Sequence, residues 1–379
     1  MNLQALLLCS DEKIVRVLRR VLNDLEIAVE HSADPELAIL KLSRRRFEAV
    51  IVDCDNPDVA GQILKAARNA PANKKAVAVA ILDGERAMRS AFELGAHFVL
   101  YKPISPERAK ASFRAARALM KCERRRATRV PVEMPVMYRF VYRGDGPVER
   151  TVSVDLSEDG IGVRLAKRHR ERGPMHVQFK LPGTSKLIDA EAELAWENPN
   201  GQAGLRFLEL PIPTRHALKA WLKSASPDSE EDPPSTCTLT DLSLGGCYLE
   251  SSTPFPVRAR LALWMKMGEL QVHASGIVRV MHPEVGMGVS FIQKTPEQRQ
   301  EVENFIHALM NSKGAIPELL VEADGLELFG EELPATDASD LEDPLLQLFE
   351  TKANAPTEEF LDELRRQRST STVETSAKA

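Results

Sequence analysis

The sequence lacks any hydrophobic run long enough to cross a bilayer. Its opening residues, MNLQALLLCS, have no basic segment and too short an apolar core for a secretion signal, so we expect a buried strand there and a cytoplasmic protein. The five cysteines form no C-x-x-C pair and no metal-ligand spacing, which indicates reduced, unpaired thiols. Because the sequence also has no Ser/His/Asp set, no Cys/His pair and no phosphate-cradling glycine loop, it predicts a protein that is not an enzyme.

A strong net charge is absent as well. The 379 residues carry a formal net charge of -5, which gives no reason to expect binding to nucleic acid or to a membrane, and we expect no DNA-binding domain. With 43% hydrophobic and 28% charged residues, the chain can instead bury two or three cores. We therefore predict a multidomain protein.

One phrase occurs twice in the chain. TVSVDLSEDGIGVRL runs from residue 151 to 165, and CTLTDLSLGGCYLES runs from 237 to 251. Each contains Asp-x-Ser-x-x-Gly between two short, strand-like runs. A repeat at the spacing of one small domain predicts two copies of that domain.

Residues 1–120 alternate short apolar runs with amphipathic helices. Continuous apolar runs of this kind indicate strands that are buried on both faces, and hence an α/β domain with a parallel sheet. In such sheets the functional residues lie at the carboxyl ends of the strands.

The pattern then changes to short strands between Gly, Pro and Asp turns, which indicates all-β sandwiches or small barrels. We predict one such domain at 123–224, a linker at 225–235 and a second domain at 236–312, each β domain closed by a helix. Residues 313–379 are acid-rich and predict a disordered tail. Within it, LEDPLLQLFETK and TEEFLDELRRQR carry apolar stripes at helical spacing, which fit transient helices in solvent or, alternatively, a motif that docks on a partner.

Charged residues follow three strands of the first domain. Asp11 and Glu12 come after the first strand, Asp53 ends the third and Lys102 follows the fifth. Carboxylates at adjacent strand ends form the hard-oxygen site that Mg²⁺ prefers, and a nearby lysine can neutralise a phosphoryl group. This stretch resembles the receiver domain of bacterial response regulators, which is flavodoxin-like. The resemblance implies that Asp53 is the phosphoacceptor, that Asp11 and Asp53 bind Mg²⁺, and that Lys102 neutralises the phosphate.

The same stretch departs from the receiver pattern. Ser10 stands where receivers carry the first of two acids, which predicts weaker metal binding. No Ser or Thr follows the fourth strand at Leu82 or Asp83, and Val99 replaces the switch aromatic. Two interpretations stay open: conventional phosphorylation of Asp53, or a receiver-like module that binds proteins or dimerises.

A basic run precedes the first copy of the repeat. ERRRATRVPVEMPV holds two arginines at R-x-x-x-R spacing, and DLSEDG follows at 155–160. Each pattern alone is ordinary, an anion patch in one case and a self-bonded turn in the other. Together they resemble the PilZ domain family, whose β-barrels bind the bacterial second messenger cyclic di-GMP. The resemblance implies a ligand site made of Arg124, Arg125, Arg129, Asp155, Ser157 and Gly160.

The residue types suit that ligand. An arginine fork can clamp phosphate bidentately, pair with guanine or stack on a base, which a lysine cannot do. We expect Arg125 and Arg129 to close over the nucleotide from a flexible segment. Asp155 and Ser157 supply an acceptor and a hydroxyl for guanine edges, and Gly160 lets the backbone turn tightly. In the PilZ family an arginine placed like Arg124 accompanies an intercalated ligand dimer, which predicts two nucleotides per site.

The second copy keeps Asp241, Ser243 and Gly246 but lacks the arginines. The segment before it, SASPDSEEDPPS, is acidic where the pattern needs a basic clamp. Because buried phosphates need cationic partners, we expect a degenerate PilZ-like domain that has kept the turn for folding and lost the ligand.

The sequence thus predicts a cyclic di-GMP receptor that couples nucleotide binding in the first PilZ domain to the receiver-like domain and to protein partners, a histidine kinase among them. One alternative is a phosphorylation-controlled response regulator whose PilZ folds are a protein-binding output. The other is a ligand-free scaffold.

Overall fold

The computed structural model describes residues 3–84, 88–141, 148–165, 173–198, 200–225, 234–293, 295–312, 317–327, 343–353 and 355–376. The chain divides into two compact units. One unit comprises Met1–Glu123 together with Asp232–Ala379, and the other comprises Arg124–Glu231. The second unit is therefore an insertion in the sequence of the first.

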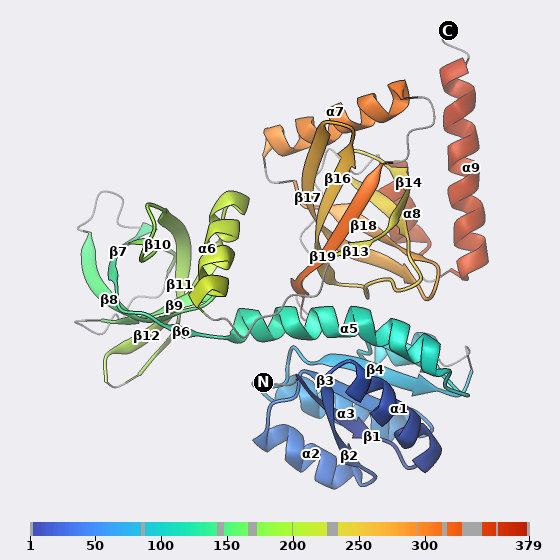
Figure 1. Cartoon of the computed structure of the whole chain (residues 1–379), viewed down its shortest axis with the longest axis horizontal. Coiled ribbons are helices and arrows are strands. Elements are labelled where there is room, and N and C mark those ends of the chain that lie inside the picture. Colours follow the sequence, from blue (N-terminus) through green and yellow to red (C-terminus); the bar gives the residue numbers. More distant parts are fainter. Residues whose placement is uncertain are drawn as a thin grey trace. The chain divides into compact units, whose positions relative to one another are not determined.

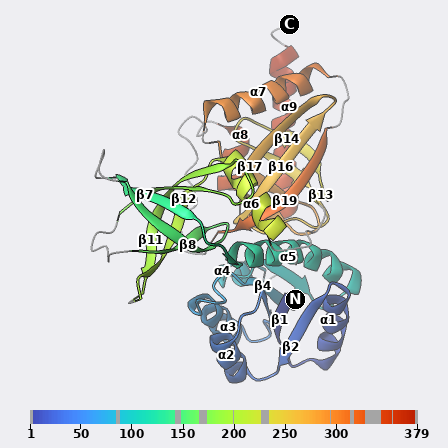
Figure 2. The same cartoon turned by 60° about the vertical axis from the view of Figure 1, so that its left-hand side comes forward.

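The amino-terminal part is a five-stranded parallel sheet in the order β2-β1-β3-β4-β5. In Figure 2, α2 and α3 lie on one side of this sheet and α1 on the other. This strand order is that of flavodoxin-like folds, so the predicted receiver-like domain is confirmed. Its elements are β1 (Leu3–Leu8), α1 (Glu12–Asp24), β2 (Ile27–Ser32), α2 (Pro35–Arg44), β3 (Ala49–Asp53), α3 (Pro57–Asn69), β4 (Val77–Leu82), α4 (Met88–Glu93), β5 (Phe98–Tyr101) and α5 (Pro106–Ala127).

Arg124–Glu231 forms a closed barrel (Figure 1). Six strands follow one another in the order β8-β7-β10-β11-β12-β9, and β9 pairs with β8 to close the ring, while β6 lies beside β8. Side chains that alternate along the strands fill the interior, as a half-buried strand requires. The elements are β6 (Val130–Pro131), β7 (Pro135–Phe140), β8 (Glu149–Leu156), β9 (Gly160–Arg164), β10 (Met175–Lys180), β11 (Leu187–Glu197), β12 (Gln202–Glu209) and α6 (Ile212–Ala225).

The second copy forms a seven-stranded sheet in the order β13-β19-β16-β17-β18-β15-β14. Strands β14 to β18 repeat the roles of β8 to β12, and α7 repeats that of α6. The confirmed fold class is thus a receiver-like sheet with two PilZ-type β domains. The elements are β13 (Ser235–Thr236), β14 (Thr238–Leu242), β15 (Gly246–Glu250), β16 (Ala259–Met267), β17 (Leu270–His282), β18 (Gly286–Phe291), α7 (Pro296–Asn311), β19 (Glu318–Leu326), α8 (Pro344–Thr351) and α9 (Thr357–Ser376).

The expected disordered tail is wrong for residues 317–327, 343–353 and 355–376. β19 pairs antiparallel with β16, as β7 does with β10, so the chain beyond α7 supplies the strand that the second copy lacks at its start. Its acidic surroundings hid this role, although Leu319, Val321 and Ala323 are buried at alternate positions of the strand. The other residues of 313–379 lie outside the described part of the chain, as do residues 226–233 of the predicted linker.

Capping residues followed by proline set the starts of several helices. The side chain of the capping residue accepts backbone N–H bonds of the first turn, and the proline fits a position where no N–H partner is needed. The pairs are Asp34–Pro35, Asn56–Pro57, Thr295–Pro296 and Asp343–Pro344.

Helix α5 extends to Ala127 and includes Arg124 and Arg125 in its last turn. The flexible segment expected for Arg125 is therefore helical. Ala and Arg are strong helix formers, and a basic last turn is favoured by the helix dipole. Thr128 ends the helix, since its hydroxyl and N–H both donate to the Arg124 carbonyl at 2.9 Å.

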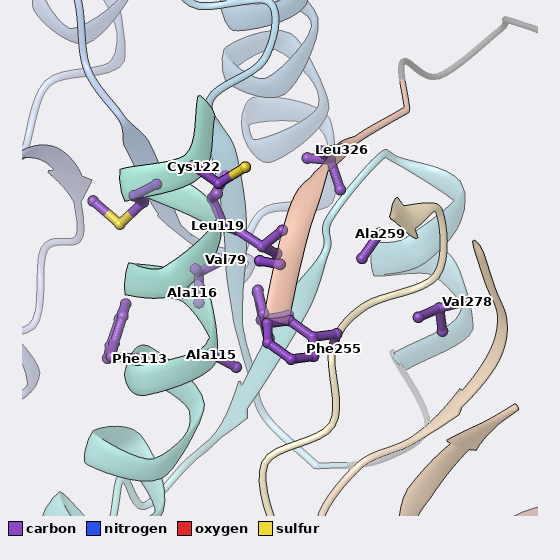
Figure 3. Close-up of a cluster of buried hydrophobic side chains, with 14 of the residues drawn as sticks. Val79, Phe113, Ala115, Ala116, Leu119, Cys122, Phe255, Ala259, Val278 and Leu326 are labelled. Atoms are coloured by element: carbon purple, nitrogen blue, oxygen red, sulfur yellow. The ribbon is translucent and has the colours of Figure 1, made fainter. Parts of the chain in front are cut away.

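Within the first unit, α5 contributes to the core of the receiver-like sheet and to that of the second β domain. Figure 3 shows Phe113, Leu119 and Cys122 of α5 in one buried cluster with Phe255 and Leu326. The cluster is continuous, so these two folds share one core. At the end of this helix the buried Glu123 carboxylate accepts the backbone N–H of Leu326 at 2.7 Å and pairs with Lys75 at 3.4 Å.

Among the described residues, no helix combines the length and hydrophobicity that a bilayer span requires.

Candidate functional site

The Asp-x-Ser-x-x-Gly phrase forms a tight turn between β8 and β9. Ser157 is buried, and both its N–H and its hydroxyl donate to the Gly160 carbonyl, at 2.9 and 3.1 Å. The second copy makes the same bonds from Ser243 to Gly246, at 2.8 and 3.2 Å. A serine that closes the turn in both copies is explained by folding, whichever copy binds a ligand.

The fold also explains why residue 160 is a glycine. A Cβ at this position would lie 2.3 Å from the Leu205 carbonyl oxygen of β12, and a Cβ at Gly246 would lie 2.4 Å from the Val289 carbonyl oxygen. Contact this close excludes a side chain. The glycine therefore permits close pairing of β9 with β12. From the sequence alone, its role was expected to be a tight turn of the backbone.

The arginines at the end of α5 are held by acidic residues of this turn. The Arg125 Nε donates to Glu158 Oε1 at 2.7 Å, and both side chains are largely buried. Arg126 makes a fork to Asp159 Oδ1, at 3.0 Å from Nε and 2.8 Å from Nη2. Burial raises the pKa of the Glu158 carboxyl, an effect that Arg125 and Lys219 oppose. Guanidiniums thus gather at the turn and are neutralised there by its own carboxylates.

Arg129 and Asp155 form a third ion pair at the same place. Their Nη1 and Oδ1 atoms are 2.5 Å apart, and the Arg129 side chain remains 42% exposed. Asp155 lies over Gly162, where a Cβ would be 2.6 Å from the Asp155 carboxylate oxygen. The expected partners Arg129 and Asp155 are thus in contact, with the arginine open to solvent.

Two paired glycines extend the surface away from Asp155. Gly162 of β9 pairs with Gly204 of β12, and we call these two residues the glycine floor. Gly204 pairs in turn with Trp196 of β11, whose indole lies where a Gly204 side chain would be. Trp196 is 44% exposed. The floor therefore runs flat between a carboxylate with its arginine at one end and an exposed indole at the other.

This arrangement suits a flat, anionic ligand. Guanidiniums can bind phosphates, and an indole beside a surface without side chains can stack with a base. The structure brings Arg125, Arg129 and Asp155 together around the turn and puts Arg124 in the last turn of the same helix.

Sequence reasoning missed the roles of Glu158, Asp159, Arg126 and Trp196. The acids lie inside the motif at its variable positions, where their charge was a visible signal. Trp196 was harder to find, because its place beside Gly204 depends on the β11–β12 register, which is irregular just before it.

The receiver-like sheet has a second polar cluster at the carboxyl ends of its strands. The Lys102 ammonium lies 2.8 Å from Asp53 Oδ1 and 2.6 Å from Asp55 Oδ1. Burial alone would lower the pKa of Lys102, but the hydrogen bonds and charges of the two aspartates raise it, so the lysine stays charged. The predicted neighbours Asp53 and Lys102 are in contact.

The predicted magnesium ligands Asp11 and Asp53 both make contacts with protein groups. Cys9 donates its thiol to Asp53 Oδ2 at 3.2 Å, and burial raises the pKa of that thiol to about 12, so it stays neutral. Asp11 caps α1 instead, with its Oδ1 accepting from Lys13 N at 2.7 Å. Among the described residues, no three His, Cys, Asp or Glu side chains form a metal-binding group, so the Mg²⁺ site stays a prediction.

Comparisons with known proteins agree with the two β folds. The PilZ domain family matches residues 123–224 and 226–308. A search of curated protein sequences gave no match.

Several solved structures are similar to parts of the chain. The receiver domain of a sensor histidine kinase from Pseudomonas aeruginosa PAO1 is 18% identical, over 32% of this chain and 98% of that one, with a TM-score of 0.28. A chemotaxis response regulator of Vibrio cholerae is 22% identical, over 31% and 99%, with a TM-score of 0.29. The PilZ domain of CeSA from a cellulose-synthesizing bacterium is 16% identical, over 26% and 97%, with a TM-score of 0.22.

Proposed function

The chain carries two PilZ domains behind a receiver-like domain, and from this we propose that it is a non-enzymatic signalling receptor for cyclic di-GMP with its nucleotide site in the first PilZ domain. The observation that carries the proposal is the exposed Arg129 paired with Asp155 at one end of the glycine floor. Arg125 and Arg124 lie at the same turn, and Trp196 lies at the other end of the floor. The second PilZ domain has no part in this site.

Nucleotide binding would exchange partners on the arginines. The phosphates of cyclic di-GMP would replace Glu158 on Arg125 and Asp155 on Arg129, since phosphate accepts the same bidentate hydrogen bonds. Asp155 would then be available for the N–H groups of guanine. A base would lie on the glycine floor beside Trp196. With Arg124 also present, the proposal includes two nucleotides per site.

The same exchange would act on the rest of the protein through α5. Arg124 and Arg125 belong to the last turn of this helix, and Glu123 directly before them is buried in the core of the first unit. The protein would have two arrangements, without and with nucleotide on these arginines. A ligand that binds the two with different affinity shifts the balance between them, and protein partners would respond to that shift. Identical small-angle scattering profiles with and without saturating nucleotide would contradict this step.

Isothermal titration of the full-length protein tests the site. We expect micromolar or tighter binding at a stoichiometry of two, and a loss of at least about tenfold for Arg125→Ala or Arg129→Ala, because each removes a charged hydrogen-bonding pair worth about 1.5 to 3 kcal/mol. Arg139→Ala, which removes an exposed arginine from β7 of the same barrel, is the matched control, and Ser243→Ala tests the second domain. Unchanged binding in the Arg125 and Arg129 variants would overturn the site, and a one-to-one stoichiometry would remove the dimer.

A phosphorylation-controlled response regulator is the second candidate, because Asp53 lies at the carboxyl end of β3 against Lys102. We expect no stable phosphoryl uptake from acetyl phosphate in the presence of Mg²⁺, since the Cys9 thiol and not a second carboxylate lies beside Asp53 Oδ2. Labelling that is lost in Asp53→Asn would favour this candidate. The variant Cys9→Asp serves as a gain-of-function control, because it restores a second carboxylate beside Asp53.

A further inference from the structure

We infer that the second PilZ domain binds a polypeptide where the first has its candidate nucleotide surface, and that the occupant is the chain's own segment 343–364. The inference does not depend on nucleotide binding by the first domain. It gives a role to the two apolar stripes of the acidic tail, which form α8 and the first part of α9.

The surface that the segment covers is the counterpart of the glycine floor. The third residue of β15, Tyr248, pairs with Gly288 of β18, just as Gly162, the third residue of β9, pairs with Gly204. Val280 of β17 pairs with Gly288 at the place that Trp196 holds in the first domain. The two surfaces therefore have the same position in the same fold.

An anionic group lies on the turn of the second domain. Asp343 Oδ1 caps α8 by accepting from Leu345 N at 3.0 Å, and Asp343 Oδ2 accepts the backbone N–H of Gly245 at 3.0 Å. Gly245 belongs to the Asp-x-Ser-x-x-Gly phrase and corresponds to Asp159 of the first copy. The segment before this turn contains no arginines. A carboxylate from the tail thus binds the turn in this domain.

Glycines let α8 approach the barrel closely. A Cβ at Gly245 would lie 2.5 Å from Leu346 Cδ1, and a Cβ at Gly288 would lie 2.6 Å from the ring of Phe349. Any side chain at these two positions would push the helix away. The lack of side chains at these two positions lets one apolar face of α8 contact the sheet directly.

Aromatic packing then holds α9. Phe360 is fully buried, with its ring centroid 4.4 Å from that of His282 and 5.6 Å from that of Tyr248. The Tyr248 hydroxyl lies 3.0 Å from His282 Nδ1. Tyr248 and Phe360 form, with the apolar residues of α8, a cluster separate from the main core of this domain. The segment is therefore bound to the outside of a fold that has its own interior.

The test uses the full-length chain with a specific protease site in place of residues 332–338, between β19 and α8. After cleavage in the folded state, we expect the fragment that carries α8 and α9 to coelute with the rest of the protein. An added fluorescent peptide of residues 339–368 should then replace it, with saturable binding. The remaining β domain should still unfold in one cooperative transition when the fragment is gone, at a lower temperature, as a domain does when it loses a ligand.

Two variants with one control make the result specific. Leu346→Asp or Phe349→Asp should release the fragment on cleavage, because each buries a charge against the glycines. Gln347→Ala, on the exposed side of the same helix, should retain it. Unfolding of the barrel on release would show that the segment is part of the core, and loss of the unmutated fragment without any peptide binding would show that the contact is too weak to be a binding site. Either result would overturn the inference.

Discussion

Glu158 competes with any anion for Arg125. Its carboxylate lies 2.7 Å from the guanidinium in a site that is largely buried, where a second anion would meet both groups. Glu158→Gln keeps the shape and an acceptor but removes the charge. We therefore expect cyclic di-GMP to bind this variant several-fold more tightly, by up to about 1.4 kcal/mol, in isothermal titration. Weaker binding would mean that Glu158 positions Arg125 for the ligand.

His282 makes the second β domain sensitive to acid. Burial lowers its pKa from 6.5 to about 4, so the unfolded chain binds more protons than the folded protein between these values. The stability that His282 contributes is present above pH 6.5 and is lost as the pH falls toward 4.

We expect urea unfolding to show this loss as about 2 kcal/mol between pH 7 and pH 5, taken as the difference between the protein and His282→Gln. The difference is needed because the buried His97 of the receiver-like sheet also has a lowered pKa. Equal pH dependence in protein and variant would show that His282 is accessible to protons in the folded state.

Strand β19 is a structural part of the second PilZ domain. It covers one edge of β16 along Glu318–Leu326, and β13 pairs on its other side. A chain that ends at Ser312 should lose the fold of this domain, because β16 would keep an unpaired edge and the core would lose Leu319, Val321 and Ala323. A chain that ends at Glu327 should keep it. Circular dichroism and thermal unfolding of the two truncations distinguish these outcomes.

The sequence predicted the elements that have a strong local pattern. The parallel sheet, the two β folds and the paired arginines were all visible in periodicity or spacing. β19 was not, because it lies in an acid-rich stretch. The apolar stripes of α8 and α9 were visible at helical spacing, but their packing on the second β domain depends on tertiary contacts. The same reason applies to the site: the arginines were found, but the partners of Arg125 and the place of Trp196 depend on contacts between elements distant in sequence.

The two compact units should unfold separately. The receiver-like sheet and the second PilZ domain share one buried cluster through α5, whereas Arg124–Glu231 has its own core. We expect two transitions in scanning calorimetry, with cyclic di-GMP raising only the one that belongs to Arg124–Glu231. At 100 times the dissociation constant the gain is about 2.7 kcal/mol. Arg129→Ala should reduce the shift to about half or less at the same nucleotide concentration, and a ligand-dependent shift of both transitions would contradict separate unfolding.

The shared core of α5 has a consequence for synthesis on the ribosome. Leu326, whose backbone N–H donates to the Glu123 carboxylate, is made long after α5. At a synthesis rate of about 5 to 20 residues per second, the chain that covers the apolar face of α5 is completed about 10 to 40 seconds after the helix. The inserted barrel, whose sequence is continuous, can fold during that interval. Nascent chains should therefore complete the unit Arg124–Glu231 first, while the exposed face of α5 is a target for chaperones.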